Sequence, residues 1–242
     1  MKNAFQLLLL IPLCFFFIQC RKESTEQSTI ENNSVPTVLE SRWLDPALVA
    51  YYPFDNNRND YAGKGSQSFV GPYTYIEKYT SDRHDNASKA LFLDGNYILD
   101  LYNIPIATAY TISAWVVNLS STTNILLISQ YGYGLNIFQN KNKYVVEEAN
   151  PVNISDVSTL IPRENWHHVV GTYDGREIRI YMDGILKSSK RFNGRIADQP
   201  SFYKLAGFGP PATTWRGYID DLMFYKRTLS QSEVSKLYND QK

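Results

Sequence analysis

Two Asp-Gly pairs stand nine residues apart in the stretch NWHHVVGTYDGREIRIYMDGILKSS, residues 165–189. Type I′ turns need a positive φ at both central residues, and Asp-Gly tolerates that conformation, so residues 174–175 and 183–184 are predicted hairpin tips. Between them the side chains alternate with a period of two, which is typical of a half-buried antiparallel strand. One side of that strand is apolar, and the other is expected to face outward or toward a groove: Ile178, Ile180 and Met182 are on the first side, and Arg179 and Tyr181 are on the second. The stretch therefore predicts a three-stranded meander.

Short strands separated by turn residues are predicted along the rest of residues 46–240. Leu91 and Leu93 fall on one face of such a strand, and residues 110–119 carry apolar side chains on both faces. No predicted strand is followed by a helix long enough for a parallel crossover. Ten or more short strands predict an all-β fold, either an antiparallel two-sheet sandwich or a barrel.

One helix is indicated, in the sequence LSQSEVSKLY near the C-terminus. Ser230 is a candidate N-cap, and Glu233 follows three residues later, which is the spacing of a capping box. Leu229 and Val234 occupy the positions of a hydrophobic staple around that cap. We expect this short helix to close one end of the β structure.

The first twenty residues, MKNAFQLLLLIPLCFFFIQC, form a segment of their own. One Lys precedes an apolar run that is short for a membrane span and that ends at Cys20. The pattern resembles a bacterial lipoprotein signal, in which residues 1–19 are removed and Cys20 becomes the lipidated first residue. The CRKES continuation resembles signals that send some lipoproteins to the bacterial cell surface. Residues 17–19 lack the usual small residue before the cysteine, so ordinary secretion is the alternative.

Residues 20–45 are rich in Ser, Thr, Glu, Gln and Asn, and they are predicted to form a flexible tether between the lipid and the domain of residues 46–240. Acyl chains contribute roughly 0.8 kcal/mol per buried methylene, so several chains give stable anchoring. We therefore expect a bacterial outer membrane lipoprotein that faces either the periplasm or the outside. Because Cys14 and Cys20 are the two cysteines of the chain, the domain is expected to contain neither a disulfide nor a thiolate metal site.

The charge balance restricts the partners of the chain. Lys and Arg number 24, Asp and Glu also number 24, and the formal net charge is zero. A nucleic-acid-binding domain needs a basic excess to neutralise phosphates, so we expect no nucleic-acid partner. The hydrophobic fraction of 43% argues against a disordered chain and supplies enough apolar bulk for one sizeable core.

The order and spacing of five stretches resemble the laminin G-like domains of the concanavalin A-like lectin and glucanase superfamily, in particular their bacterial pentraxin-like branch. The stretches are LVAYYPFDNNRNDYAGKG (48–65), TSDRHDNASKALFLDGNYI (80–98), YTISAWV (110–116), WHHVVGTYDGREIRIYMDG (166–184) and WRGYIDDLMFYKRTLSQSEVSKLY (215–238). The resemblance implies a jelly-roll sandwich of two antiparallel sheets. It does not fix the function, because members bind glycans, bind proteins, cleave polysaccharides or act as passive modules.

Catalysis is not expected. A glycoside hydrolase needs two carboxylates placed across the scissile bond, and related glucanases carry a Glu-x-Asp-x-x-Glu arrangement that does not occur in this sequence. The closest acidic pairs are residues 147–148 and 220–221, and adjacent residues of a strand face opposite sides of the sheet. No motif of a serine hydrolase or a zinc protease is present either.

Four residues are candidate metal ligands: Asp55, Asn57, Asp60 and Asp220. In a jelly roll the first and last strands commonly lie side by side, so Asp55 and Asp220 are expected to approach each other. Two close carboxylates require a cation. Calcium, which binds carboxylate and amide oxygens and occurs in several related jelly rolls, is one alternative. A salt bridge to Arg83 is the second, and acids exposed to solvent are the third.

Exposed aromatic rings are the expected contacts for a sugar, because the C–H face of a sugar ring is apolar. The candidates are Tyr131, Tyr133, Tyr203 and Trp215. Packing within turns is the alternative for the tyrosines, and the resemblance implies that an aromatic residue at position 215 closes the edge of the sandwich. We therefore expect a surface-anchored module that binds glycans without catalysis. A protein-interaction or structural module is the alternative, and a glycoside hydrolase is the third hypothesis.

Overall fold

The structure is a computed structural model, and the chain divides into two compact units, residues 1–34 and 35–242. The structure describes the following residues, all in the second unit: 45–63, 67–70, 77–96, 98–104, 107–119, 124–129, 134–140, 143–149, 154–160, 164–192, 202–207 and 215–242.

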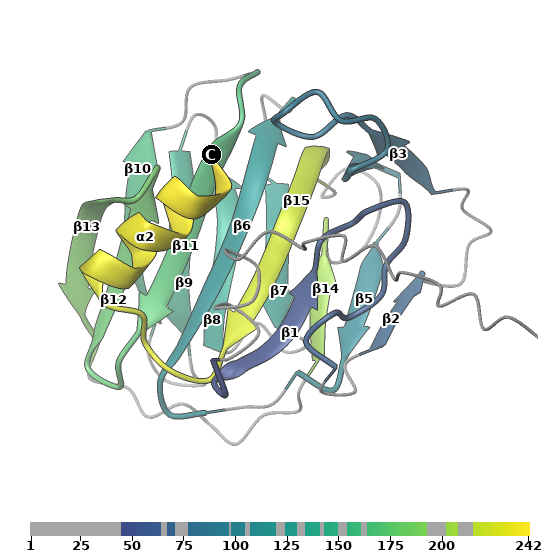
Figure 1. Cartoon of the computed structure of the whole chain (residues 1–242). Coiled ribbons are helices and arrows are strands. Elements are labelled where there is room, and N and C mark those ends of the chain that lie inside the picture. Colours follow the sequence, from purple (N-terminus) through teal and green to yellow (C-terminus); the bar gives the residue numbers. More distant parts are fainter. Residues whose placement is uncertain are drawn as a thin grey trace, which may run out of the picture. The chain divides into compact units, whose positions relative to one another are not determined.

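Two antiparallel sheets form the fold (Figure 1). Sheet A runs in the order β13-β12-β11-β6-β15-β4-β3, and β1 also pairs with β15. Its strands are β1 (Leu48–Tyr52), β3 (Lys78–Thr80), β4 (Ala90–Asp94), β6 (Tyr110–Asn118), β11 (His167–Tyr173), β12 (Glu177–Met182), β13 (Ile185–Arg191) and β15 (Arg216–Tyr225). The pairing of the first strand with the last agrees with the expectation for a jelly roll.

Sheet B runs in the order β10-β9-β8-β7-β14-β5-β2. Its strands are β2 (Gln67–Val70), β5 (Leu99–Tyr102), β7 (Asn124–Ser129), β8 (Gly134–Asn140), β9 (Lys143–Ala149), β10 (Ile154–Leu160) and β14 (Phe202–Leu205). Strands of the two sheets contact each other, with β12 against β9 and β11 against β8, so the predicted two-sheet sandwich is confirmed.

The apolar core lies between the sheets. Leu91 and Leu93 of β4 contribute to it, as expected from their alternation, and so do Leu99 and Leu101 of β5. β4 belongs to sheet A and β5 to sheet B, so the turn at Gly95 carries the chain from one sheet to the other. β6 is buried along its whole length. The core between the sheets covers one of its faces, and the C-terminal helix packs against Trp115 on the other face.

The two Asp-Gly turns of the meander differ. Asp183 and Gly184 have φ values of 54° and 75°, so both central residues are left-handed, as a type I′ turn requires. At the other tip only Gly175 is left-handed, with a φ of 90°. The Asp174 carboxylate there accepts hydrogen bonds from two later backbone N–H groups, at 2.9 and 2.8 Å, which builds a three-residue loop. The type I′ prediction is correct for the second tip and wrong for the first.

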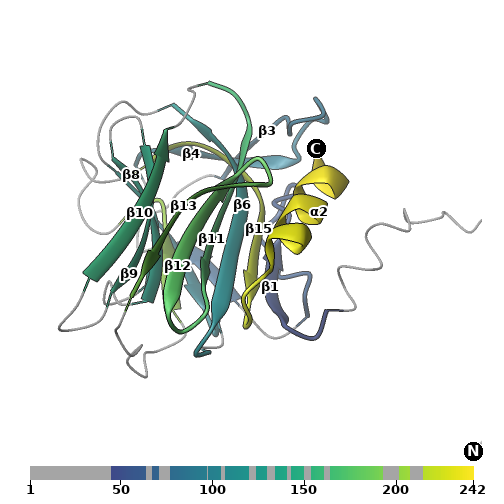
Figure 2. The same ribbon diagram turned by 90° about the vertical axis from the view of Figure 1, so that its left-hand side faces the viewer.

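A single helix, α2 (Gln231–Gln241), follows β15 among the described residues. Its capping box is confirmed, because Glu233 N–H donates to the Ser230 side chain while Ser230 N–H donates to the Glu233 carboxylate. Figure 2 shows α2 on the side of sheet A that faces away from sheet B, so the helix covers a face of this sheet, and the expectation that it closes one end of the β structure is wrong. Leu229 and Val234 pack there with Tyr181 in a second apolar cluster, so Tyr181 is buried by the helix and does not face outward as expected.

The second Asp-Gly turn also receives the helix. The Gly184 carbonyl accepts hydrogen bonds from the side chains of Gln231 and Ser235, both at 2.7 Å. A Cβ at Gly184 would lie 3.1 Å from the ring of Tyr238, so glycine allows both the turn and the close approach of α2. Of the helices in the described residues, none is both long and apolar enough to cross a membrane.

Candidate functional site

A buried cluster of one cation and two carboxylates lies on the helix side of sheet A. The Arg83 guanidinium donates to Asp220 at 2.6 Å and to Asp221 at 2.7 Å. The three side chains are 10%, 5% and 9% exposed. Neighbouring residues of a regular strand would point to opposite faces, but β15 has an irregularity in its pairing with β6 here, and Asp221 has a φ of 47°. The expectation that Asp220 and Asp221 face opposite sides is therefore wrong.

Helix α2 completes this cluster through its last residue. The Gln241 side chain donates to Asp221 at 3.2 Å and accepts from the indole N–H of Trp115 at 2.9 Å. Arg83 also donates to the Gln241 carbonyl and lies over the Trp115 ring, 4.7 Å from its centroid. Burial, and next the charge of Asp221, raise the pKa of Asp220 well above its usual value, while Arg83 opposes that rise. The cluster fastens the end of α2 to the sheet and is closed to a ligand.

The predicted metal ligands have separate partners in the structure. Asp55 pairs with Lys89 at 2.8 Å, and Asp220 pairs with Arg83, which was the second alternative for that carboxylate. Asp60 accepts hydrogen bonds from two backbone N–H groups, each at 2.9 Å, and Asn57 donates to the Asp55 carbonyl at 2.7 Å. Within the described part of the chain, no three His, Cys, Asp or Glu residues are arranged to hold a metal ion. The loop of residues 55–60 keeps the buried second oxygen of Asp60 without a hydrogen-bond partner, so calcium there stays a prediction.

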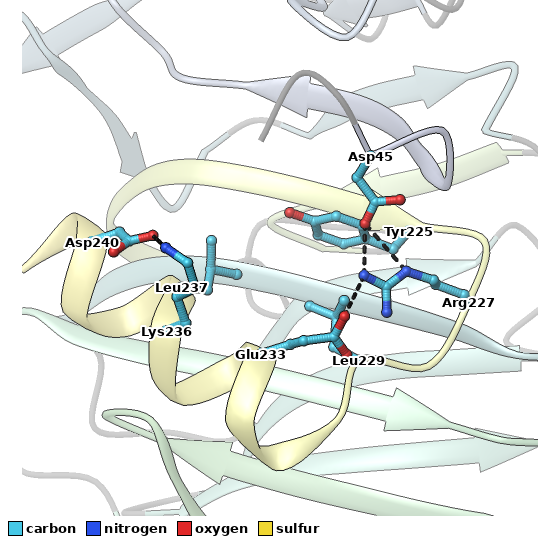
Figure 3. A pocket seen from close by; sticks show the side chains of 8 residues that line it. All are labelled: Asp45, Tyr225, Arg227, Leu229, Glu233, Lys236, Leu237 and Asp240. Atoms are coloured by element: carbon cyan, nitrogen blue, oxygen red, sulfur yellow. Dashed lines mark hydrogen bonds and ion pairs between the residues drawn. The ribbon is translucent and has the colours of Figure 1, made fainter. Parts of the chain in front are cut away.

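A pocket of about 190 Å³ lies between α2 and the end of β15 (Figure 3). Its charged residues are paired with one another: Arg227 contacts both Asp45 and Glu233 at 2.7 Å, and Lys236 contacts Asp240 at 2.6 Å. The apolar part of its lining is formed by Tyr225, Leu229 and Leu237, which are buried. We interpret the two Arg227 ion pairs as the attachment of α2 to the start of the described chain, because they link Glu233 of the helix to Asp45.

Two of the four predicted aromatic contacts, Trp215 and Tyr203, are not where a ligand would need them. Trp215 is fully buried in the core, so it offers no ring face to a sugar, and this corrects the expectation. The Tyr203 ring lies 5.2 Å from the ring of Phe224 in sheet A, so it points between the sheets and is likewise a core contact. Tyr131, Tyr133 and Cys20 lie outside the described residues.

The outer face of sheet B carries a different aromatic group. Because Tyr203 points inward, its neighbours Phe202 and Lys204 point outward, and the register places them opposite Tyr102 and Asp100 of β5. The Tyr102 and Phe202 rings are stacked with centroids 4.4 Å apart. Phe202 is buried, whereas Tyr102 is 36% exposed. One aromatic ring is therefore presented to solvent on a supporting ring.

Two charged side chains lie beside these rings. Lys204 donates to Asp100 at 2.8 Å and lies 4.9 Å from the centroid of Phe202. The Tyr102 hydroxyl donates to the other Asp100 oxygen at 3.3 Å. Burial, and then the charge of Asp100, raise the pKa of Tyr102, so the hydroxyl keeps its proton. We define these four residues, Asp100, Tyr102, Phe202 and Lys204, as the β5–β14 platform.

The sequence contained a signal for half of this platform. In β5, with the sequence LDLY, leucines alternate with Asp100 and Tyr102, so a strand assignment alone places both outward once the leucines are assigned to the core. In β14, with the sequence FYKL, aromatic residues stand at adjacent positions, and either can be the inner one. The inner residue is Tyr203 and the outer one is Phe202, so the predicted exposed ring at Tyr203 is one residue away from the one that lies beside Tyr102. A shift of one residue exchanges the two faces of a strand.

Comparisons with known proteins agree with this architecture. A binding domain of Paraclostridial Mosquitocidal Protein 1 is similar with a TM-score of 0.68 and 20% identity, over 81% of this chain and 52% of that one. The receptor binding domain of botulinum neurotoxin mosaic serotype C/D is similar with a TM-score of 0.67 and 12% identity, over 81% of this chain and 51% of that one. The chain thus spans about half the length of these toxin domains.

A third similar structure matches over nearly its full length. It is domain 4 of AbnA, an extracellular arabinanase of Geobacillus stearothermophilus, in complex with arabinotriose, with a TM-score of 0.65 and 21% identity over 79% of this chain and 98% of that domain. At such identities the likeness shows the fold alone. No curated protein sequence matches the chain. The model of the family Laminin_G_3 matches residues 94–235, more than half of the sequence, so the chain belongs to the concanavalin A-like lectin/glucanases superfamily.

Proposed function

We propose that this chain is a non-catalytic module that binds glycans through the β5–β14 platform. The observation that carries the proposal is the exposed ring of Tyr102, supported by Phe202 and flanked by the Asp100–Lys204 pair. The apolar C–H face of a sugar ring suits an aromatic face, while hydroxyl groups need hydrogen-bond partners at its edge. The platform offers both within two neighbouring strands.

The placement of the carboxylates supports binding without hydrolysis. Asp220 and Asp221 come together, but they are buried and occupied by Arg83. A glycoside hydrolase needs two carboxylates that reach the glycosidic bond from either side, one as acid and one as base or nucleophile. Ser113 and His168 also form a pair, at 2.8 Å, and both are buried in the sheet, so this pair lacks the access that a nucleophile needs.

The family and its neighbours support the choice of ligand. The arabinanase domain is described with a bound arabino-oligosaccharide, and it matches this chain over nearly its whole length. A surface protein is the second candidate partner, because the neurotoxin neighbour is described as a receptor binding domain. In that case the platform would contact a side chain or peptide of the partner in place of a sugar.

We further propose that Cys20 carries the lipid that attaches the module to a bacterial outer membrane. The support is the apolar run that ends at this residue and the polar tether after it. Replacing Cys20 by Ala is expected to release the protein from the membrane fraction. The same variant is also expected to lose incorporation of a labelled fatty acid. Membrane association that survives the substitution would contradict the lipid anchor.

The glycan proposal is tested by screening the full-length protein on an array of neutral and acidic oligosaccharides and measuring the best ligand by calorimetry. Tyr102→Ala is expected to abolish measurable binding, because it removes the exposed ring. Tyr61→Ala is the matched control, since Tyr61 is a similarly exposed tyrosine, at 45%, on a loop after β1. Equal loss in both variants, or binding unaffected by Tyr102→Ala, would contradict the platform. A protein partner captured through Tyr102 without any glycan binding would favour the second candidate.

A further inference from the structure

We infer that the β5–β14 platform selects neutral sugars and discriminates against sugars that carry a carboxylate. This inference rests on the proposed glycan-binding function and names the ligand class of the same site. It follows from the state of the cation on the platform. Lys204 would attract an acidic sugar if it were alone, but its charge is already paired with Asp100 at 2.8 Å.

The pair has little freedom to separate. The Lys204 and Asp100 side chains are only 23% and 14% exposed. Lys204 is also placed over the Phe202 ring, and Asp100 is also held by the Tyr102 hydroxyl. A ligand carboxylate would therefore have to compete with Asp100 for Lys204. It would also approach Asp100 in a site where water screens the repulsion less than in bulk solution.

Hydroxyl groups match the remaining hydrogen-bonding capacity of the pair. An ammonium group has three donors, and one is used for Asp100. A carboxylate can accept several hydrogen bonds, and Asp100 accepts one at each oxygen. Neighbouring hydroxyls on a sugar can thus donate to Asp100 and accept from Lys204 without breaking the pair. The two partners act as a neutral donor–acceptor unit beside the stacking ring.

The experiment compares one ligand in two forms. The neutral oligosaccharide that binds best is oxidised at its primary hydroxyl groups to carboxylates, and calorimetry of the full-length protein measures both. We expect the oxidised form to bind about tenfold more weakly or worse. Equal or tighter binding of the oxidised form would overturn the inference while leaving the glycan proposal intact. An array without any bound glycan, neutral or acidic, would overturn both.

Two variants should move the discrimination in opposite directions. Asp100→Asn removes the repelling charge and frees Lys204, so the oxidised form should gain affinity relative to the neutral form. Lys204→Met leaves the Asp100 charge uncompensated, so the ratio of the affinity for the neutral form to the affinity for the oxidised form should increase. Asp156→Asn is the control, because Asp156 is an exposed carboxylate on β10 of the same sheet. Circular dichroism establishes that each variant is folded, and a ratio that is unchanged in both platform variants would contradict the assignment.

Discussion

The two outer faces of the sandwich use similar residues for different ends. On the helix side of sheet A, Arg83 and two aspartates form a buried cluster that α2 closes. On the outer side of sheet B, Lys204 and Asp100 form a partly exposed pair next to Tyr102. The difference is burial. An ion pair enclosed by a helix stabilises the fold, whereas one beside an exposed ring can exchange water for ligand hydroxyls.

The buried cluster and the β5–β14 platform also differ in the balance of their positive and negative charges. The buried cluster has two carboxylates for one guanidinium, and burial then favours a proton on one of them, which is the direction in which the pKa of Asp220 moves. The platform has one carboxylate for one ammonium and needs no further neutralisation. The excess of carboxylates over cations thus occurs in the buried cluster, from which solvent is excluded. The pair with equal numbers of opposite charges lies on the platform, which solvent can reach.

The largest effect is expected from Arg83→Met. It leaves two carboxylates buried without a cation, and breaking a buried pair in this way costs about 3–5 kcal/mol. Chemical denaturation should show this loss in the free energy of unfolding. The control is Lys89→Met, which removes a pair whose side chains are 46% and 38% exposed and should cost less than about 1 kcal/mol. Similar losses in the two variants would remove the distinction between buried and exposed pairs.

A smaller change in stability is expected from Tyr102→Ala. Its stacking on Phe202 is worth about 0.5–1.5 kcal/mol beyond the area that it buries, and the ring is partly exposed. In the same denaturation experiment, the loss in the free energy of unfolding should be larger than that of Lys89→Met and smaller than that of Arg83→Met. A loss as large as that of Arg83→Met would mean that the platform is a structural element like the cluster under α2, and the functional contrast between the two faces would fail.

The pH dependence should reveal the ion pairs around α2. The hydrogen bond from Arg227 lowers the pKa of Glu233 from 4.5 to about 2. A carboxylate with a lowered pKa in the folded state contributes stability above pH 4.5, and that contribution is lost as the pH falls toward 2. Glu233 is well exposed, so solvent screening keeps the effect modest. Between pH 5 and 2, Glu233→Gln should lose stability less steeply than the wild type, and equal slopes would contradict a contribution from this ion pair.

The smallest effect is expected from calcium. Lys89 and Arg83 already pair with Asp55 and Asp220, and Asp60 accepts two backbone hydrogen bonds. Chelation should therefore change the melting temperature little. A clear fall on chelation, together with heat on adding calcium back, would support the calcium prediction for the loop of residues 55–60. Asp60→Asn should then abolish that heat.

Local patterns predicted the elements of this protein well where one residue type permits few conformations. Ser230 and Glu233 marked the start of α2 because a capping box uses only neighbouring groups. The Asp183–Gly184 turn was predictable for the same reason. The Asp174–Gly175 turn was not, because the Asp174 side chain bonds to later backbone groups and changes the length of the loop.

The candidate site was harder to predict because it depends on which side of each strand faces the core. In FYK, both Phe202 and Tyr203 suit a core position, and only the contact of Tyr203 with Phe224 in sheet A decides between them. For Asp220 and Asp221, alternation predicted opposite faces, and the irregularity in β15 brought them together on Arg83, 137 and 138 residues away in sequence. No local pattern in the sequence encodes such a distant partner.

The sequence by itself therefore determined the antiparallel strands and the capped helix, because turn chemistry, alternation and capping act between residues close in the chain. The family followed separately, from the resemblance of five stretches to known members and from the matching family model. Only the tertiary structure decided which carboxylates are buried under α2 and which aromatic ring faces solvent on sheet B. Those outcomes depend on the stacking of two sheets and on a one-residue register. Both are settled by the free energy of packing distant strands together.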